Sequence, residues 1–206
     1  ETFLPRASRF DPIPDMQWSF GNIGVNDKAR FLATMYIEDV GDLIKEVVTP
    51  YFGFSRYAEK LGMSAHSFAP IEHALKQPEN IIDVWLLELF KNHIEQYRPD
   101  VVGITIPFPG NLYAGLKCGQ YIKKHFPHIK IVAGGGFVNT ELRDFSEPAI
   151  FDYMDFITLD DGERPLLSIL QFLQGEKSKE KLTRTFILID DEVRYINDDK
   201  EQDFHH

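Results

Sequence analysis

The chain has 206 residues and a formal net charge of −10, with 43% hydrophobic and 13% aromatic residues. This composition excludes an intrinsically disordered chain, and the acidic balance disfavours nucleic acid and anionic membranes as partners. The single cysteine, Cys118, excludes a disulfide framework or a cysteine-ligated zinc site within the chain and fits a cytoplasmic location. No apolar run reaches the roughly 18 residues that a transmembrane helix needs.

Residues 1–38 and 39–98 differ in pattern. Proline, glycine and aromatic residues follow one another through the first segment without a regular period, which predicts an irregular arm. Its opening residues, Thr2 to Pro5, fit the end of a strand that begins before Glu1. The second segment has apolar residues at helical spacing and is expected to be mainly helical.

The clearest helix is predicted over Ile81–Tyr97, where apolar residues form one wide stripe. Glu79 or Asn80 is expected to cap its start, and Pro99 to end it. Shorter helical patterns precede it, over Val40–Val48 and over Tyr51–Leu61, with Gly62 as a stop.

Residues 99–175 alternate between strand and helix patterns. Short, continuous apolar runs separated by helices predict a parallel sheet covered on both faces. The predicted strands are Val101–Ile106, Ile129–Ala133 and Phe156–Leu159. The predicted helices are Leu112–Phe126, Asn139–Phe151 and Arg164–Leu173, with Gly175 closing the last.

The C-terminal part is predicted to form a β-hairpin. Its strands are Phe186–Ile189 and Val193–Ile196, and its turn is Asp190-Asp191, which lacks the glycine that such turns favour. The residues from Asn197 onward are charged, and they end in His205 and His206, which are natural sequence or a tag remnant.

Ligands of open parallel sheets bind beyond the carboxyl ends of the strands. The loops after the three predicted strands are therefore expected to lie side by side and to form one groove. Their candidate binding residues are Thr105, Pro107, Phe108, Gly110 and Asn111 after the first strand, Gly134, Gly135, Gly136 and Phe137 after the second, and Asp160, Asp161, Gly162 and Glu163 after the third.

Two of these loops have more than one interpretation. Gly134, Gly135 and Gly136 admit a ligand close to the main chain, or they only form a tight turn from strand to helix. The acidic Asp160–Glu163 loop caps the following helix and touches a ligand, which we favour, or it binds a divalent cation.

The chain has no recognisable catalytic motif. It lacks H-E-x-x-H, G-x-S-x-G, the dinucleotide glycine pattern and the P-loop. We therefore predict no catalytic residue and no metal ligand in this chain.

Two segments carry a family resemblance. They are Arg98–Thr105 with Pro107–Asn111, and Ile131–Thr140 with its three glycines. In this order and spacing, with the acidic loop at residues 155–165, they resemble the cobalamin-binding domain at the front of many radical SAM proteins. The resemblance covers residues 98–196 firmly and residues 39–97 more loosely.

The resemblance implies an α/β fold of the flavodoxin-like (Rossmann-type) class, a three-layer sandwich with a mostly parallel sheet. It implies that cobalamin is held with its nucleotide tail along the sheet. Gly134 to Gly136 would admit the tail, the Thr105–Asn111 loop would form a second wall, and the Asp160–Glu163 loop would close the third side. The axial-histidine motif D-x-H-x-x-G of the methionine-synthase type is absent, so a corrinoid would be held without that ligand.

The resemblance also implies a domain organisation. Residues 1–38 form the arm, 39–184 the cobalamin-binding-like domain, and 185–206 a hairpin and linker toward a radical SAM barrel of the same polypeptide. That barrel would bind an iron–sulfur cluster and S-adenosylmethionine, for which this chain lacks the cysteines. The chain alone is then not an enzyme, although its parent is one.

Two alternatives remain open at the level of the sequence. One is a structural or docking domain of the same fold that has lost cobalamin. The other is a flavodoxin-like module that binds flavin or phosphate, although the loops that such a module needs are not found.

Overall fold

A computed structural model describes residues 24–54, 57–63, 68–143 and 147–198 of the chain. The predictions for residues 1–23, including the strand end at Thr2–Pro5, lie outside the described residues. The chain divides into two units, Glu1–Ser55 and Arg56–His206, and each is described by itself.

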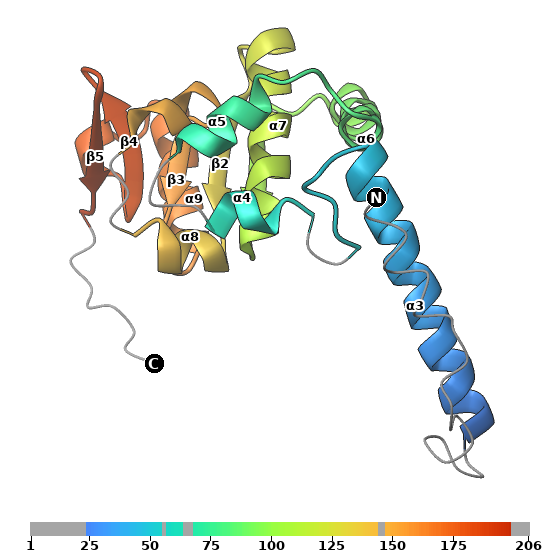
Figure 1. The fold of residues 1–206 in the computed structure, drawn as a ribbon. Helices are drawn as coiled ribbons and strands as arrows, with labels where there is room; N and C mark the ends of the chain where they lie inside the picture. Colours follow the sequence, from blue (N-terminus) through green and yellow to red (C-terminus); the bar gives the residue numbers. More distant parts are fainter. Residues whose placement is uncertain (1–23, 55–56, 64–67, 144–146, 199–206) are drawn as a thin grey trace. The chain divides into compact units, whose positions relative to one another are not determined.

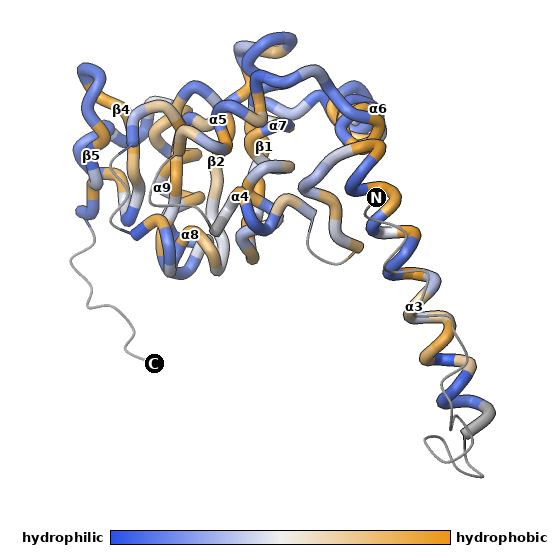
Figure 2. Tube along the Cα trace, in the orientation of Figure 1, coloured by the Kyte–Doolittle hydropathy of each residue, from blue (hydrophilic) through white to orange (hydrophobic). Residues whose placement is uncertain are grey.

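The first unit is dominated by one long helix, α3 (Gly24–Val47), followed by a short irregular segment. Figure 2 shows hydrophobic and hydrophilic residues alternating along α3. The aromatic rings of Phe52 and Phe54 meet edge to face at 5.0 Å, and a Cβ on Gly41 would lie 3.2 Å from the Phe54 ring. Helix was expected only from residue 39, and this was wrong: the turn-forming residues of the arm end before Gly24, so residues 24–38 continue the helical pattern.

The second unit contains helices and a sheet (Figure 1). Its α-helices are α4 (Glu59–Met63), α5 (Ala69–Leu75), α6 (Ile81–Tyr97), α7 (Pro109–His125), α8 (Gly136–Glu141) and α9 (Glu163–Leu173). The short 3₁₀ helices are η2 (Pro148–Asp152) and η3 (Lys179–Lys181). The strands are β1 (Val101–Thr105), β2 (Lys130–Gly134), β3 (Phe156–Thr158), β4 (Thr185–Ile189) and β5 (Glu192–Ile196).

The sheet is five-stranded, in the order β1-β2-β3-β4-β5. The pairs β1–β2 and β2–β3 are parallel, whereas β3–β4 and β4–β5 are antiparallel. The predicted parallel strands and the hairpin are therefore confirmed, and the described part of the chain is a mixed α/β fold. Asp190 and Asp191 both have positive φ, 52° and 60°, which is the backbone of a two-residue hairpin turn without glycine.

Helices pack on both faces of the sheet. On one face, α7 lies close to β1, since a Cβ on Gly115 would lie 3.2 Å from the Ile104 side chain. On the other face, Ile169 of α9 is fully buried in a cluster with Val132 and Phe156. Burying each such side chain is worth about 1.5–3 kcal/mol, so these clusters fix both helices on the sheet.

The start of α6 follows the sequence prediction closely. Asn80 is the cap: its side chain accepts hydrogen bonds from the N–H groups of Ile82, at 2.8 Å, and Asp83, at 3.2 Å. The Asp83 carboxylate accepts in return from the Asn80 N–H and also from the Tyr113 hydroxyl of α7, both at 3.2 Å. The capping group thereby joins α6 to α7, with Asp83 only 1% exposed.

Two other helix predictions were wrong in extent. In place of a helix over Tyr51–Leu61, the described residues contain only α4 from Glu59, with Gly62 inside it. Gly62 lies within α4 and serves close packing: a Cβ there would lie 2.3 Å from the Pro109 carbonyl oxygen of α7. In place of one helix over 139–151, the chain forms α8 and η2, since Pro148 cannot continue a helix begun at Gly136.

None of the helices that the structure describes combines the length and the apolar character needed to cross a membrane.

Candidate functional site

The carboxyl ends of the three parallel strands lie next to one another. Thr105 of β1 pairs with Gly134 of β2, and Ala133 pairs with Ile157 of β3. A pocket of about 410 Å³ opens at this edge of the sheet. It is lined by Gly103, Ile104, Thr105, Val132, Gly134, Gly135, Thr158, Asp160, Gly162, Glu163 and Leu166. We call it the sheet-end pocket.

Glycines open this pocket from two sides. A Cβ placed on Gly103 or on Gly162 would meet nothing within 4 Å. Their missing side chains therefore create accessible space and do not serve internal packing. Gly103 is exposed in the middle of β1, where a side chain would project over the pocket.

The triple glycine has a different role at each position. A Cβ on Gly134 would lie 2.6 Å from the Thr158 hydroxyl oxygen, so Gly134 allows β2 and β3 to approach. Gly135 has φ +116°, a conformation that side chains disfavour, and its Cβ would lie 2.8 Å from the Ile106 carbonyl oxygen. Gly136 is exposed and begins α8. Tight packing and turn geometry therefore account for part of this motif.

Hydrogen bonds hold the loop after β1 against the loop after β2. The Ile106 N–H donates to the Gly134 carbonyl at 2.7 Å, and the Phe137 N–H donates to the Ile106 carbonyl at 3.1 Å. On β3, the Thr158 hydroxyl donates to the Ala133 carbonyl at 3.1 Å. Hydrogen bonds therefore join the backbone of the neighbouring strand ends beneath the pocket.

The acidic loop after β3 is held by cations and by an amide. Arg184, only 4% exposed, donates to the Asp161 carboxylate at 2.6 Å, and Arg143 pairs with Asp160. The Asn139 side chain accepts from the Asp160 N–H at 2.7 Å and donates to the Asp160 carbonyl at 3.2 Å.

The expected role of the loop at the start of α9 is found only in part. Glu163 lies in the first turn of α9, where the helix dipole favours negative charge. The capping residue is Gly162, and no side-chain cap hydrogen bond forms there, because both aspartates point to arginines. The described residues also contain no group of three or more potential metal-binding side chains close together. The acidic loop contributes Asp160, Gly162 and Glu163 to the lining of the pocket.

About half of the predicted binding residues line the sheet-end pocket, namely Thr105, Gly134, Gly135, Asp160, Gly162 and Glu163. Phe137 is instead buried in the core, and a Cβ on Gly110 would lie 2.7 Å from the Tyr57 carbonyl oxygen, so both serve packing. Pro107, Phe108, Asn111, Gly136 and Asp161 are exposed near the same strand ends without lining the pocket.

Several residues of the site were not predicted from the sequence. Gly103 could have been predicted, because a glycine inside a strand often marks a place where a ligand or another backbone segment approaches closely. Thr158 and Leu166 follow from strand and helix periodicity once the pairing is known. Arg143 and Arg184 are distant in sequence from the aspartates that they bind, so no local pattern could have identified them.

The outer edge of β1 is open within the described part of the chain. Bonds to β2 involve even-numbered residues, such as the Asp100 carbonyl and the Ile106 N–H. Because a strand alternates in direction, the backbone groups of Val101, Gly103 and Thr105 point to the opposite edge. No described strand pairs with that edge.

Comparisons with protein-family models, with curated proteins and with solved structures found no match to this chain.

Proposed function

We propose that this chain is a flavodoxin-like, cobalamin-binding-type module that holds the nucleotide tail of a corrinoid in the sheet-end pocket. The observation that carries the proposal is Gly103. Gly103 lies in the middle of β1, and its position without a side chain faces open space. The loops that follow β2 and β3 lie directly beside it. A structural strand gains stability from a β-branched residue at such a position, so glycine there favours a ligand.

The chemistry of the lining suits the tail of cobalamin. Val132 and Leu166 offer an apolar surface to an aromatic base, whereas the Ile104 side chain lies on the α7 face of the sheet. Thr105, Thr158 and Glu163 offer hydroxyl and carboxylate groups to a sugar. The volume of about 410 Å³ lies within the usual range for small-molecule pockets, about 300–1,000 Å³. It suits the tail and leaves the corrin ring outside.

Histidine is not among the described residues that line the pocket, so these residues supply no imidazole ligand to cobalt. A bound corrinoid supplies a cobalt centre for methyl transfer or radical rearrangement. This chain's own residues would bind and orient the tail. The reaction would belong to a radical SAM barrel of the same polypeptide, in the cytoplasm, with its iron–sulfur cluster and S-adenosylmethionine.

Hydroxocobalamin binding tests the proposal. We expect the purified chain to bind it with a Kd of about 1 μM or tighter, measured by absorbance changes and by equilibrium dialysis. Gly103→Val places a β-branched side chain at the pocket, at a position where an added Cβ meets nothing within 4 Å. It should fold normally and bind at least about tenfold more weakly.

Arg194→Val is the matched control, because it also adds valine to an exposed strand position, on β5 and away from the pocket. It should bind as the original chain does. Absence of binding by the folded chain, or equal binding by Gly103→Val, would contradict the proposal.

The open edge of β1 favours a second candidate, a docking domain that has lost cobalamin. Unpaired backbone at a parallel edge strand is a site for further strand pairing. Hydrogen exchange would separate the candidates. A docking role predicts rapid exchange of the Gly103 and Thr105 amides in this chain, strong protection in a longer polypeptide that includes the barrel, and no effect of hydroxocobalamin on either.

A further inference from the structure

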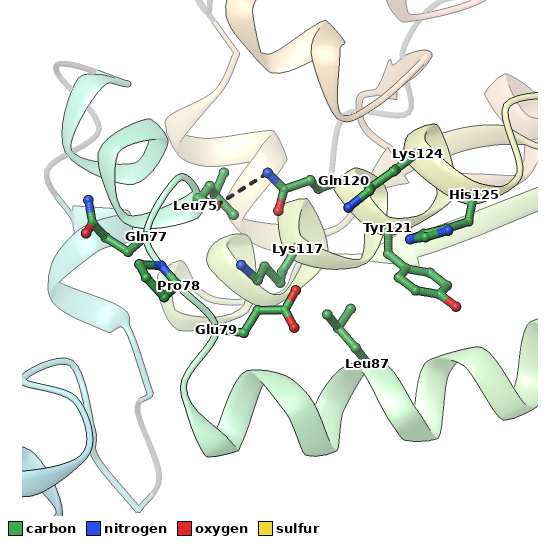
Figure 3. A pocket seen from close by; sticks show the side chains of 10 residues that line it. All are labelled: Leu75, Gln77, Pro78, Glu79, Leu87, Lys117, Gln120, Tyr121, Lys124 and His125. Atoms are coloured by element: carbon green, nitrogen blue, oxygen red, sulfur yellow. Dashed lines mark hydrogen bonds between the residues drawn. The ribbon is translucent and has the colours of Figure 1, made fainter.

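A second hollow lies between α6 and α7, away from the sheet-end pocket. It has a volume of about 360 Å³ and is lined on one side by residues of α7 (Figure 3). Leu75 at the end of α5, the connection Gln77–Glu79 and Leu87 of α6 form the other walls. The α7 residues that line it are Lys117, Gln120, Tyr121, Lys124 and His125.

Lys117 is the unusual residue of this hollow. Its side chain is only 2% exposed, and none of the hydrogen bonds or ion pairs among the described residues involves it. Lysine is rarely buried to this extent without a partner. Its Nζ is not among the fully buried unpartnered atoms of the described residues, so the stem is buried while the ammonium group reaches the space of the hollow. Figure 3 shows its nitrogen directed into the hollow, toward the Pro78–Glu79 connection.

The other charges of the lining favour an anion. Lys124 and His125 contribute two further basic groups, whereas Glu79 is the one carboxylate among the described lining residues. Glu79 is exposed, and its carboxylate oxygens lie more than 4.0 Å from the Lys117 Nζ, so the two side chains form no ion pair.

Neighbouring contacts hold the lining in place. The Gln120 amide donates to the Leu75 carbonyl at 3.4 Å, and the Tyr121 and His125 rings lie 4.6 Å apart. The lining is therefore held by its own contacts, and the ammonium group of a buried lysine faces into the hollow.

We propose that this hollow binds a phosphate-type oxyanion, with the Lys117 ammonium group as its main ligand and with Lys124 and His125 at its rim. Phosphate carries more charge than a carboxylate and suits a lining whose basic groups outnumber the acidic ones. The site is independent of the sheet-end pocket, since the two share no lining residue. Failure of either proposal therefore leaves the other intact.

Inorganic phosphate is the probe. Amide chemical shifts of the full chain, followed by NMR at constant ionic strength, should show saturable changes at residues 117–125 on addition of phosphate. Acetate at the same ionic strength should produce clearly weaker changes. Unsaturable changes, or equal responses to phosphate and acetate, would overturn the proposal.

Lys117→Met keeps the shape of the buried stem and removes the charge. We expect phosphate affinity to fall at least about tenfold, the usual effect of losing a charge-assisted hydrogen bond. Lys181→Met changes an exposed lysine of η3 and should leave phosphate binding unchanged. Equal affinity of Lys117→Met and the original chain would refute the assignment. Lys124→Gln is a second variant at the rim, and it should weaken binding by a smaller factor.

Glu79→Gln separates the proposal from a simpler account in which Glu79 neutralises Lys117 in solution. If phosphate is the partner, removing the competing carboxylate should tighten phosphate binding. If Glu79 is the partner, the variant should lower the melting temperature without any gain in phosphate affinity, and the proposal would fail.

Discussion

The glycines of α7 and those of the sheet-end pocket have opposite surroundings. A Cβ on Gly119 would lie 2.2 Å from the Tyr153 carbonyl oxygen, whereas a Cβ on Gly103 or Gly162 would meet nothing within 4 Å. The first kind of glycine lets a helix approach its neighbours, and its cost of substitution is steric. The second kind leaves room for something outside the chain. The comparison shows that neighbouring glycines of one sheet and its helices can be required for opposite reasons, close packing in α7 and open space at the pocket.

Replacing one glycine of each kind by alanine should produce the largest difference in the free energy of unfolding. Gly119→Ala forces a methyl group into backbone and should lower the free energy of unfolding by about 3 kcal/mol, despite the better helix propensity of alanine. Gly103→Ala is the matched control and should change it by less than about 0.5 kcal/mol. Urea denaturation measures both. Equal losses would mean that the pocket glycine also serves internal packing.

A smaller effect should follow from removing the buried cation behind the acidic loop. Arg184→Met leaves the Asp161 carboxylate without its partner at 2.6 Å and should cost about 2 kcal/mol of unfolding free energy. Arg194→Met breaks an exposed pair with Glu192 and should cost less than about 0.5 kcal/mol. If the two variants were equally stable, the loop would not depend on Arg184.

The packed helix α7 also contains Cys118, whose burial predicts that the stability of the fold depends on pH. Burial raises the pKa of the Cys118 thiol to about 11. The unfolded thiol loses its proton near pH 9, before the folded one does, so stability is lost as the pH rises. About 1 kcal/mol should be lost between about pH 8 and pH 10. In Cys118→Ala this part of the slope should disappear, and identical slopes would contradict the assignment.

The regular elements were largely predictable from sequence because their signals are local. Asn80 and the apolar stripe of α6 fix that helix within a few neighbouring residues. The apolar runs of β1 to β3 alternate with helices, which dictates parallel pairing. The hairpin turn was recognisable, although two aspartates replace the favoured glycine.

The site was predictable only in outline. Adjacent parallel strands bring their following loops to one edge, which placed Thr105, Gly134 and Gly162 correctly at the pocket. Which glycine faces open space depends on the residues that pack around it in the fold. Those residues are distant in sequence, so the sequence of one loop does not reveal them. Asp160 and Asp161 pair with Arg143, just after α8, and with Arg184, just before β4, and the charge pattern of the loop could not predict these partners. Only Glu163 takes the place at the start of α9 that the charge of the loop predicted.

Binding of the nucleotide tail in the sheet-end pocket is the central proposal for this chain. Comparing cobalamin with cobinamide, which lacks the nucleotide tail, tests this most directly. Equilibrium dialysis of the unmodified chain should give at least about tenfold tighter binding of cobalamin, corresponding to about 1.4 kcal/mol or more. Equal affinities for the two compounds would show that the pocket between β1, β2 and α9 does not bind the tail.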